Sequence, residues 1–369
     1  MELVLAVDAI VPPLTGIGRY AWELAQYYSH CDAESIRVRF DFHGTWVDDV
    51  AGLLNEGPPR VGRRAGKFLP ARAIRWWRRH EARDRVYHGP NYFLPEDVER
   101  GIVTVHDLSV FKYPQTHPIE RLKQFERNFA STLKRASHII TDSEATRREV
   151  AEYFGWSLSD ISSIRLGVPQ QFRRYETAEL GEPLSKYGLI PGRYSLCIST
   201  LEPRKRIDQL LHVYRNLPAT VLKRYPLVIG GSKGWLSDEL SAQIREGEEE
   251  GWLRYLGFIP ENVLPIIYAG SRAFLYPSMY EGFGLPVLEA LASGIPTLTA
   301  NCSSLPEVAN GAAWLVEVDD HGALLDGIVK VLCDDEWRSF AVARGLAVAS
   351  ETTWAKCAQQ TLEVCRQFG

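Results

Sequence analysis

The chain from 278 to 291 reads Ser278-Met279-Tyr280-Glu281-Gly282-Phe283-Gly284-Leu285-Pro286-Val287-Leu288-Glu289-Ala290-Leu291. The apolar run of residues 273–277 before it predicts a buried strand that ends at a proline. Gly282 and Gly284 then allow the backbone to approach a ligand closely. Pro286 suits the first turn of a helix. The stretch therefore predicts a strand, a glycine loop and a helix, whose free N-terminal amides favour an anion such as phosphate.

Two glutamates flank this predicted anion site. Glu281 lies in the loop and Glu289 lies on the helix. Two carboxylates beside an anion suit sugar hydroxyls better than they suit the anion itself. An ordinary strand-to-helix turn with two solvated glutamates is the alternative, because Glu is usually a surface residue. Spacing alone leaves both interpretations open.

The same residues resemble a known family. Glu281 and Glu289, with Gly-Phe-Gly-Leu-Pro between them, are similar to the signature of retaining glycosyltransferases of family 4. The resemblance implies that Glu281 holds the donor sugar and that Glu289 holds the nucleotide ribose. It also implies contact with the sugar and the phosphates for Gly282, Phe283, Gly284 and Leu285.

A second motif follows the predicted strand of residues 194–198. Arg204 and Lys205 provide two cations for a diphosphate at the end of that strand. A basic helix start is the alternative, but Glu202-Pro203-Arg204-Lys205 is similar to a run in the same family.

The strand predicted over residues 253–259 ends, by the same resemblance, beside the nucleobase. The resemblance therefore implies that Phe258 and Ile259 contribute to the nucleoside site.

Two glycines near the start of the chain form another candidate site. Gly16, Gly18 and Ala21 fit the dinucleotide fingerprint G-x-G-x-x-A, in a predicted loop before a helix over residues 20–28. A nicotinamide site should follow its strand at once, and here about eight residues intervene. Similar transferases have a glycine loop at this place, which implies that Gly16 and Gly18 approach the donor diphosphate.

His106 ends the buried strand predicted over residues 102–107. Ligands bind at the carboxyl ends of strands in open α/β sheets, so His106 is well placed for a site. A lone histidine is more often structural. The run from His106 to Phe111 resembles the family, whose members keep a histidine near the donor sugar, and this implies a catalytic role.

Strands and helices alternate through both halves of the chain, which predicts two parallel-sheet α/β domains. The resemblance implies the GT-B fold, with two Rossmann-like domains facing across a cleft. We expect an acceptor-binding domain over 1–170, a linker over 171–190 and a donor domain over 191–353. A terminal helix within 354–369 should cross back to the first domain.

Composition narrows the class of protein. The 369 residues have a net charge of −4, divided as +3 over residues 1–175 and −7 over 176–369. The six cysteines are scattered without a C-x-x-C pair, which favours a reducing cytoplasm and argues against a zinc site. No Asp-x-Asp motif ends a strand. We therefore expect no metal and no cofactor, the nucleotide sugar being a substrate.

The segment from Arg60 to Arg85 interleaves basic residues with Phe68, Trp76 and Trp77 at helical spacing. Such a segment can lie on an anionic membrane, or it can pack its tryptophans on its own domain. Nucleic acid is a weaker candidate, because no nucleic-acid module accompanies it. The start of the chain reads as a strand and not as a leader. We expect a cytoplasmic protein, with the inner face of the plasma membrane as a surface it can reach.

The function predicted from these motifs is transfer of a hexose from a nucleotide-diphosphate sugar to a glycan or lipid-linked acceptor. The motif variants resemble bacterial mannosyl- and rhamnosyltransferases of surface polysaccharide synthesis, which favours a GDP-sugar and leaves UDP and dTDP sugars open. Double displacement and front-face attack both remain open. The rival functions are a nucleotide-sugar epimerase, a non-catalytic partner protein and a dehydrogenase.

Overall fold

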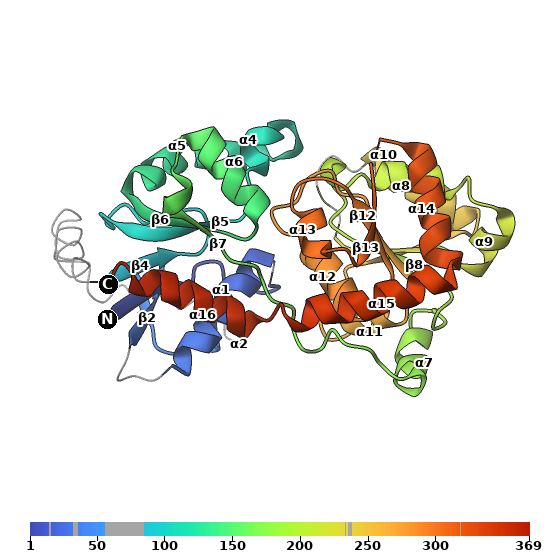
Figure 1. The fold of residues 1–369 in the computed structure, drawn as a ribbon, viewed down its shortest axis with the longest axis horizontal. Coiled ribbons are helices and arrows are strands. Elements are labelled where there is room, and N and C mark those ends of the chain that lie inside the picture. The colour runs from blue at the N-terminus through green and yellow to red at the C-terminus, as the bar shows by residue number, and fades with distance from the viewer. Residues whose placement is uncertain (15, 32–35, 56–84, 233, 235–237, 318) are drawn as a thin grey trace. The chain divides into compact units, whose positions relative to one another are not determined.

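The computed structural model describes residues 1–14, 16–31, 36–55, 85–232, 234, 238–317 and 319–369, which form two compact units (Figure 1). Unit 1 consists of Met1–Leu108, Ile119–Gly167 and Trp354–Gly369. Unit 2 consists of Ser109–Pro118 and Val168–Thr353.

Unit 1 is built on one sheet, whose described strands are seven and follow the order β3-β2-β1-β4-β5-β6-β7. Its elements are β1 (Glu2–Ala6), α1 (Gly16–Ser29), β2 (Arg37–Phe42), β3 (Thr45–Val47), α2 (Gly52–Asn55), β4 (Val86–Gly89), β5 (Gly101–Val105), α5 (Ile119–Arg135), β6 (Ala136–Thr141), α6 (Glu144–Phe154), η2 (Leu158–Asp160), β7 (Ile161–Ser163) and α16 (Trp354–Arg366).

The pairings in this sheet are parallel except at one edge. β3 runs antiparallel to β2, joined by a two-residue turn in which His43 and Gly44 both have positive φ. Such a turn matches the twist of a hairpin, so the chain folds straight back instead of crossing over. The parallel sheet expected from the sequence is confirmed for the other strands, and this edge strand was not foreseen.

Unit 2 is built on a second sheet. Its elements are α4 (Ser109–Lys112), η1 (Pro114–Thr116), α7 (Thr177–Ser185), β8 (Ser195–Ile198), η3 (Pro203–Lys205), α8 (Ile207–Tyr214), α9 (Ala219–Arg224), β9 (Leu227–Gly230), α10 (Asp238–Glu249), β10 (Leu253–Gly257), α11 (Leu264–Ala269), β11 (Ala273–Tyr276), α12 (Leu285–Ala292), β12 (Thr297–Ala300), α13 (Leu305–Ala309), β13 (Ala313–Val316), α14 (His321–Cys333) and α15 (Asp335–Ser350).

The described strands of unit 2 are six and all parallel, in the order β10-β9-β8-β11-β12-β13. The central strands β9, β11 and β12 are buried along their whole length, as expected for strands that helices cover on both faces. A fully buried Leu, Ile, Val or Phe side chain stabilises the fold by about 1.5–3 kcal/mol, so this core holds the strand ends firmly in place.

The stretch 171–190 was expected to be an irregular linker, and the structure instead contains helix α7 there. A capping box between Glu176 and Glu179 closes the helix start, and Leu180 and Leu184 are buried. Reciprocal capping satisfies two free backbone donors, which stabilises a short helix in a polar stretch.

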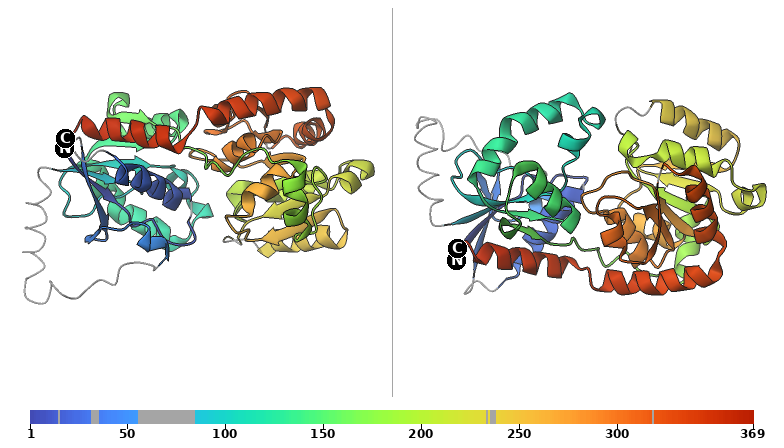
Figure 2. Two further views of the ribbon diagram at one scale, coloured as in Figure 1. Left: turned by 90° about the horizontal axis from the view of Figure 1, so that it is seen from below. Right: turned by 45° about the horizontal axis from the view of Figure 1, so that its top comes forward.

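Helix α16 belongs to unit 1 although it follows unit 2 in the chain. It lies beside α1 in Figure 1, and both views in Figure 2 show it running along unit 1. The Tyr28 hydroxyl donates a hydrogen bond to the Ala358 carbonyl at 3.4 Å. Trp354, Cys357 and Leu362 of α16 are buried. The last residues of the chain therefore form a helix that packs within unit 1.

Candidate active site

The candidate site of unit 2 lies where the strand order reverses. β8 is hydrogen-bonded to β9 on one side and to β11 on the other, so the loops after β8 and β11 lie together at the carboxyl edge. The Met279 amide donates to the Arg204 carbonyl at 3.0 Å, which ties the two loops directly. Open α/β sheets bind their ligands at such a reversal.

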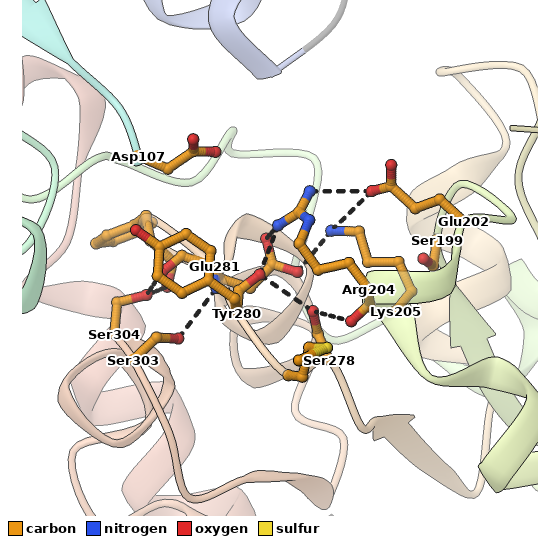
Figure 3. Close-up of polar contacts among 12 residues, drawn as sticks. Asp107, Ser199, Glu202, Arg204, Lys205, Ser278, Tyr280, Glu281, Ser303 and Ser304 are labelled. Carbon is orange, nitrogen blue, oxygen red and sulfur yellow. Dashed lines mark hydrogen bonds and ion pairs between the residues drawn. The ribbon is translucent and has the colours of Figure 1, made fainter. Parts of the chain in front are cut away.

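A buried cluster of charges occupies this place (Figure 3). The Lys205 ammonium donates to Glu281 Oε1 at 2.5 Å and to the Tyr276 hydroxyl at 3.1 Å. The Tyr276 hydroxyl in turn donates to Glu281 Oε1 at 2.8 Å. The Lys205 and Glu281 side chains are 10% and 12% exposed. The ion pair is therefore largely shielded from solvent, but part of its surface remains accessible to a ligand.

The neighbouring Arg204 completes the cluster. Its guanidinium donates to Glu202 Oε1 at 2.9 Å and to the Tyr280 carbonyl at 2.5 Å, and it lies 3.7 Å from Glu281 Oε2. Glu202 is also 3.9 Å from the Lys205 ammonium and is 4% exposed. Two carboxylates thus balance two cations, which limits the cost of burying four charged groups.

The cations set the ionisation of Glu281. Burial on its own would raise the pKa of this carboxyl, but Lys205 and then Arg204 outweigh it and lower the pKa below the ordinary 4.5. Glu281 is therefore an anion at neutral pH. The pKa of Tyr276 is raised well above its usual range, first by burial and then by Glu281, so Tyr276 stays a hydrogen-bond donor.

The glycine loop is shaped as the sequence predicted. α12 begins at Leu285 with Pro286 in its first turn, and Gly284 caps it with φ of 110°. A Cβ on Gly284 would lie 2.8 Å from the Leu305 side chain, so both conformation and space favour glycine. Two serines that precede α13 also hold the loop in place. Ser304 Oγ donates to the Phe283 carbonyl at 2.7 Å, and the Glu281 amide donates to Ser303 Oγ at 3.0 Å.

A second glycine brings another loop onto the same edge. Gly231, directly after β9, has φ of 139°, and a Cβ there would lie 1.9 Å from the Ser199 carbonyl oxygen. Only glycine allows the loop after β9 to pack this tightly on the loop after β8.

The three predicted nucleoside residues lie in different surroundings. Phe258 follows β10 and its side chain is 60% exposed, whereas Ile259 is buried and fills the space beside Gly230. Glu289 is half-buried on α12 near Tyr268, whose pKa is raised by burial first and then by Glu289. An exposed ring suits stacking on a base, and a buried isoleucine leaves only its backbone for a ligand.

In unit 1, His106 follows β5 and both of its ring nitrogens are engaged. Nδ1 lies 2.7 Å from Asp142 Oδ2, and Nε2 lies 2.8 Å from the Pro90 carbonyl, to which it can only donate. Burial lowers the pKa of His106, but Asp142, the Pro90 carbonyl and Asp107 together outweigh it and raise the pKa above its ordinary value. The ring is thus fixed in place, and a substrate contact would require it to release Pro90.

Gly16 and Gly18 lie in the first turn of α1, and the expectation of a loop with a helix from Tyr20 is wrong at this point. Gly18 is buried in that helix. Glycine is common both in loops and at helix ends, so the sequence could not distinguish the two.

The segment 60–85 lies outside the described residues except for its last residue. Arg85 Nε lies 3.1 Å from Glu2 Oε2 and is 15% exposed. In the described part of the chain, no three His, Cys, Asp or Glu side chains are grouped to hold a metal ion. None of the described helices is long and apolar enough to span a bilayer.

Three residues of the cluster were not predicted from the sequence. Glu202 and Tyr276 flank the predicted cations, and Ser303 supports the loop. Glu202 stands in the same motif as Arg204, and Tyr276 is the last residue of β11. Their positions in the sequence therefore carried a usable signal.

Comparison with known proteins identifies the family. Residues 191–344 match the family model described as glycosyl transferases group 1. Over 378 residues, and 98% of each chain, the protein is 36% identical to O-antigen chain mannosyltransferase B of Escherichia coli. Over 191 residues, 52% of this chain and 49% of the relative, it is 26% identical to O-antigen chain mannosyltransferase RfbU of Salmonella typhimurium.

Solved structures agree in fold. The chain matches the crystal structure of WaaG, a glycosyltransferase involved in lipopolysaccharide biosynthesis, with a TM-score of 0.71 at 14% identity over 98% of this chain and 99% of that one. It matches Anabaena HepE in complex with UDP and glucose with a TM-score of 0.72 at 15% identity over the whole of both chains. The predicted GT-B fold of two Rossmann-like domains is confirmed, and the chain belongs to the group 1 glycosyltransferases.

Proposed function

We propose that this protein is a retaining mannosyltransferase that moves a mannosyl group from GDP-mannose to a glycan or lipid-linked acceptor in cell-surface polysaccharide synthesis. The mannosyltransferases among its relatives support the sugar and the pathway class. The rest of the proposal depends on the site in unit 2.

The charge cluster at the reversal between β8 and β11 carries the proposal. An ammonium has three donors, and among the described residues Glu281 and Tyr276 accept hydrogen bonds from Lys205, with Glu202 at the longer distance of 3.9 Å. A further N–H of Lys205 would therefore turn toward a phosphate oxygen. Arg204 adds a second cation beside it. These groups would offset the charge that grows on the departing diphosphate, and preorganised contacts of this kind are commonly the largest contribution to catalysis.

Glu281 suits the orientation of the sugar better than attack on it. Its Oε1 accepts from two donors and its Oε2 faces Arg204, and its lowered pKa marks a stabilised anion. A carboxylate that is stabilised by this many hydrogen bonds and cations is a weak nucleophile. We therefore favour the front-face route, in which the acceptor oxygen bonds to the anomeric carbon as the phosphate leaves and takes the hydroxyl proton.

The remaining predicted contacts complete the proposal. Phe258 would stack on the base, Glu289 would bind the ribose, and the amides of residues 282–285 would face the sugar and the phosphates. Gly16, Gly18 and His106 remain predicted contacts of the donor, with His106 acting through a ring already held by the protein.

The direct test is incubation with GDP-mannose and an α-linked manno-oligosaccharide, with the product analysed by NMR for its anomeric configuration. We expect one added α-linked mannosyl group and stoichiometric GDP. Consumption of the nucleotide sugar without acceptor would favour an epimerase. The absence of any GDP release would favour a non-catalytic protein, and an absorbance change with NAD would favour a dehydrogenase.

The donor base can be tested without turnover. We expect GDP-mannose to raise the melting temperature more than UDP- or dTDP-sugars at equal concentration, because a ligand that binds only the folded state stabilises it. A larger shift with UDP-glucose would replace GDP in the proposal and leave the transferase itself intact.

Activity should survive a chelator. Arg204, Lys205 and the loop amides provide positive charge for the diphosphate, so treatment with EDTA followed by desalting should leave the initial rate nearly unchanged. Loss of activity that manganese or magnesium restores would show that a metal is needed.

The basic segment of residues 60–85 is proposed to bind anionic membranes. Each Lys or Arg near such a surface contributes roughly 1 kcal/mol, and salt screens the attraction beyond about 8 Å at physiological ionic strength. We expect co-sedimentation with anionic liposomes at low salt, and its loss when Arg75, Arg78 and Arg79 are replaced by Ser. Equal binding to neutral liposomes would contradict the proposal.

A further inference from the structure

A cavity of about 490 Å³ lies within unit 1, beyond the carboxyl ends of β1, β2 and β4. Its volume falls in the range of small-molecule sites, about 300–1,000 Å³. β1 is paired with β2 on one side and β4 on the other, so the strand order reverses here, as it does at the site of unit 2. The fold therefore places this cavity where open α/β sheets bind ligands.

The side chains around the cavity come from both the sheet edge and helix α5. Asp8 follows β1, Asp41 belongs to β2, and Asn91 follows β4. The ring of Phe93 is half-buried and packs edge-on against Phe125, with ring centroids 5.0 Å apart. Carboxylates, amides and an aromatic ring are the groups that bind sugar hydroxyls and the apolar face of a sugar ring.

One face of α5 forms the opposite wall. The residues that line the cavity from this helix recur at helical spacing and are Gln124, Arg127, Asn128, Ser131 and Arg135. Arg135 is already bound to the wall, because its guanidinium donates to the Leu94 carbonyl at 3.0 Å and to the Val98 carbonyl at 2.6 Å. Glu126 lies on the same helix and is not part of the lining.

The charge of the lining argues against an anionic ligand. Among the described residues that line the cavity, four carry carboxylates and two carry guanidinium groups. Three of the four carboxylates act on a common neighbour, since the pKa of Tyr87 is raised by burial and then by Asp41, Asp8 and Asp97. They do not converge into a metal-binding group within the described chain. Hydroxyl donors of an uncharged ligand fit this lining better than a phosphate or a metal ion.

The carboxylates are also held in position. The Tyr87 hydroxyl donates to Asp41 Oδ2 at 2.9 Å, and the His43 amide donates to Asp8 Oδ1. The Pro90 carbonyl, at the cavity wall, accepts from His106 Nε2 at 2.8 Å. His106, which the sequence predicted to lie near the donor sugar, is therefore hydrogen-bonded to a residue that lines the cavity.

We propose that this cavity binds the uncharged terminal sugar of the acceptor glycan, with Asp8 and Asp41 accepting hydrogen bonds from its hydroxyls and Asn128 contacting it from α5. The proposal rests on the proposed transferase function and specifies its acceptor. The cavity selects a neutral saccharide end, and any phosphate of a lipid-linked acceptor lies outside it.

The test uses the full chain and α-linked mannotriose, with binding measured by calorimetry in wild type, Asp8→Asn and Asn128→Ala. Asp8→Asn keeps the shape and the acceptor for His43, and it should raise the Kd for mannotriose at least about tenfold, as expected for a lost hydrogen bond to a charged group. Asn128→Ala should raise it several-fold. Glu126→Gln is the matched control on α5 and should not change it. GDP affinity should be equal in all four proteins, which also shows that the variants are folded.

Different results would overturn the cavity proposal and the transferase proposal. Mannotriose affinity that is unchanged in both variants, absence of mannotriose binding to wild type, or equal binding of mannose 6-phosphate would overturn the cavity proposal. If mannotriose binds as expected and no nucleotide sugar is turned over, the cavity remains a saccharide site and the transferase proposal fails. If transfer occurs and its KM for mannotriose is the same in Asp8→Asn, the transferase remains and the cavity assignment fails.

Discussion

Glu281→Gln is expected to lower kcat by about 100-fold or more while leaving GDP affinity equal or slightly stronger. Glu281 is the anion that Lys205 and Tyr276 hold at 2.5 and 2.8 Å, and it stands beside the predicted sugar position. Losing one preorganised charge contact of this kind commonly costs a factor of about 10²–10³ in kcat. The neutral amide also neutralises the two cations less, so a diphosphate should not bind more weakly.

Initial rates with GDP-mannose and calorimetry with GDP measure the two effects separately. Tyr276→Phe removes one hydrogen bond to Glu281 and should give a smaller loss of kcat. Glu239→Gln, at an exposed position on α10, should behave as wild type. Near-normal turnover in Glu281→Gln would remove Glu281 from the active site.

Lys205→Ala is expected to raise the Kd for GDP by about tenfold or more and to change guanosine affinity little. A hydrogen bond to a charged group is worth about 1.5–3 kcal/mol, and each 1.4 kcal/mol is tenfold in Kd. Only the phosphates differ between the two ligands, so the comparison isolates the phosphate contact. Equal losses for GDP and guanosine would contradict it.

The same substitution should also destabilise unit 2. Breaking a buried ion pair costs about 3–5 kcal/mol. Glu281 is 12% exposed, and we expect the lower end of this range because Arg204 still lies 3.7 Å from its Oε2. With Lys205 absent, the pKa of Glu281 would rise, because the largest of the interactions that lower it is lost. In wild type, the stabilisation from its lowered pKa is present above the ordinary value of 4.5 and is lost as the pH falls below it.

A double variant separates stability from binding. Lys205→Met combined with Glu281→Gln removes both charges, so it should recover much of the melting temperature lost in Lys205→Ala. Its GDP affinity should remain weak, because the phosphate partner is still absent. Recovery of GDP affinity together with stability would show that Lys205 acts only through the fold.

Local patterns predicted the part of the site that one stretch of chain makes. The strand, the glycine loop and the helix over 273–292 are recognisable because burial, positive φ and a proline in the first turn each require a particular residue type. Lys205 and Glu281 are 76 residues apart in the chain, and their contact depends on β8 and β11 being neighbours in the sheet. The resemblance to the family placed them in one site, which spacing alone could not do.

What the sequence missed has the same physical origin. Glu202 and Tyr276 stand in or beside the predicted motifs, but the contacts that they make with the cations depend on the strand order. The cavity of unit 1 is lined from β1, β2, β4 and α5, so no short motif marks it. The capping box of α7 uses Glu176 in place of the usual Ser or Thr. The hairpin turn after β2 uses His43 and Gly44, where Asn-Gly or Asp-Gly is the usual signal.

The position of α16 has a consequence for the order in which the protein can fold on the ribosome. Domains made in full can fold while synthesis continues. Unit 2 is complete once residue 353 has emerged, whereas unit 1 still lacks the helix that covers α1 and buries Trp354, Cys357 and Leu362. The half of the chain that is translated first is therefore the half that is finished last, and until then the face of α1 that α16 covers has no cover from that helix.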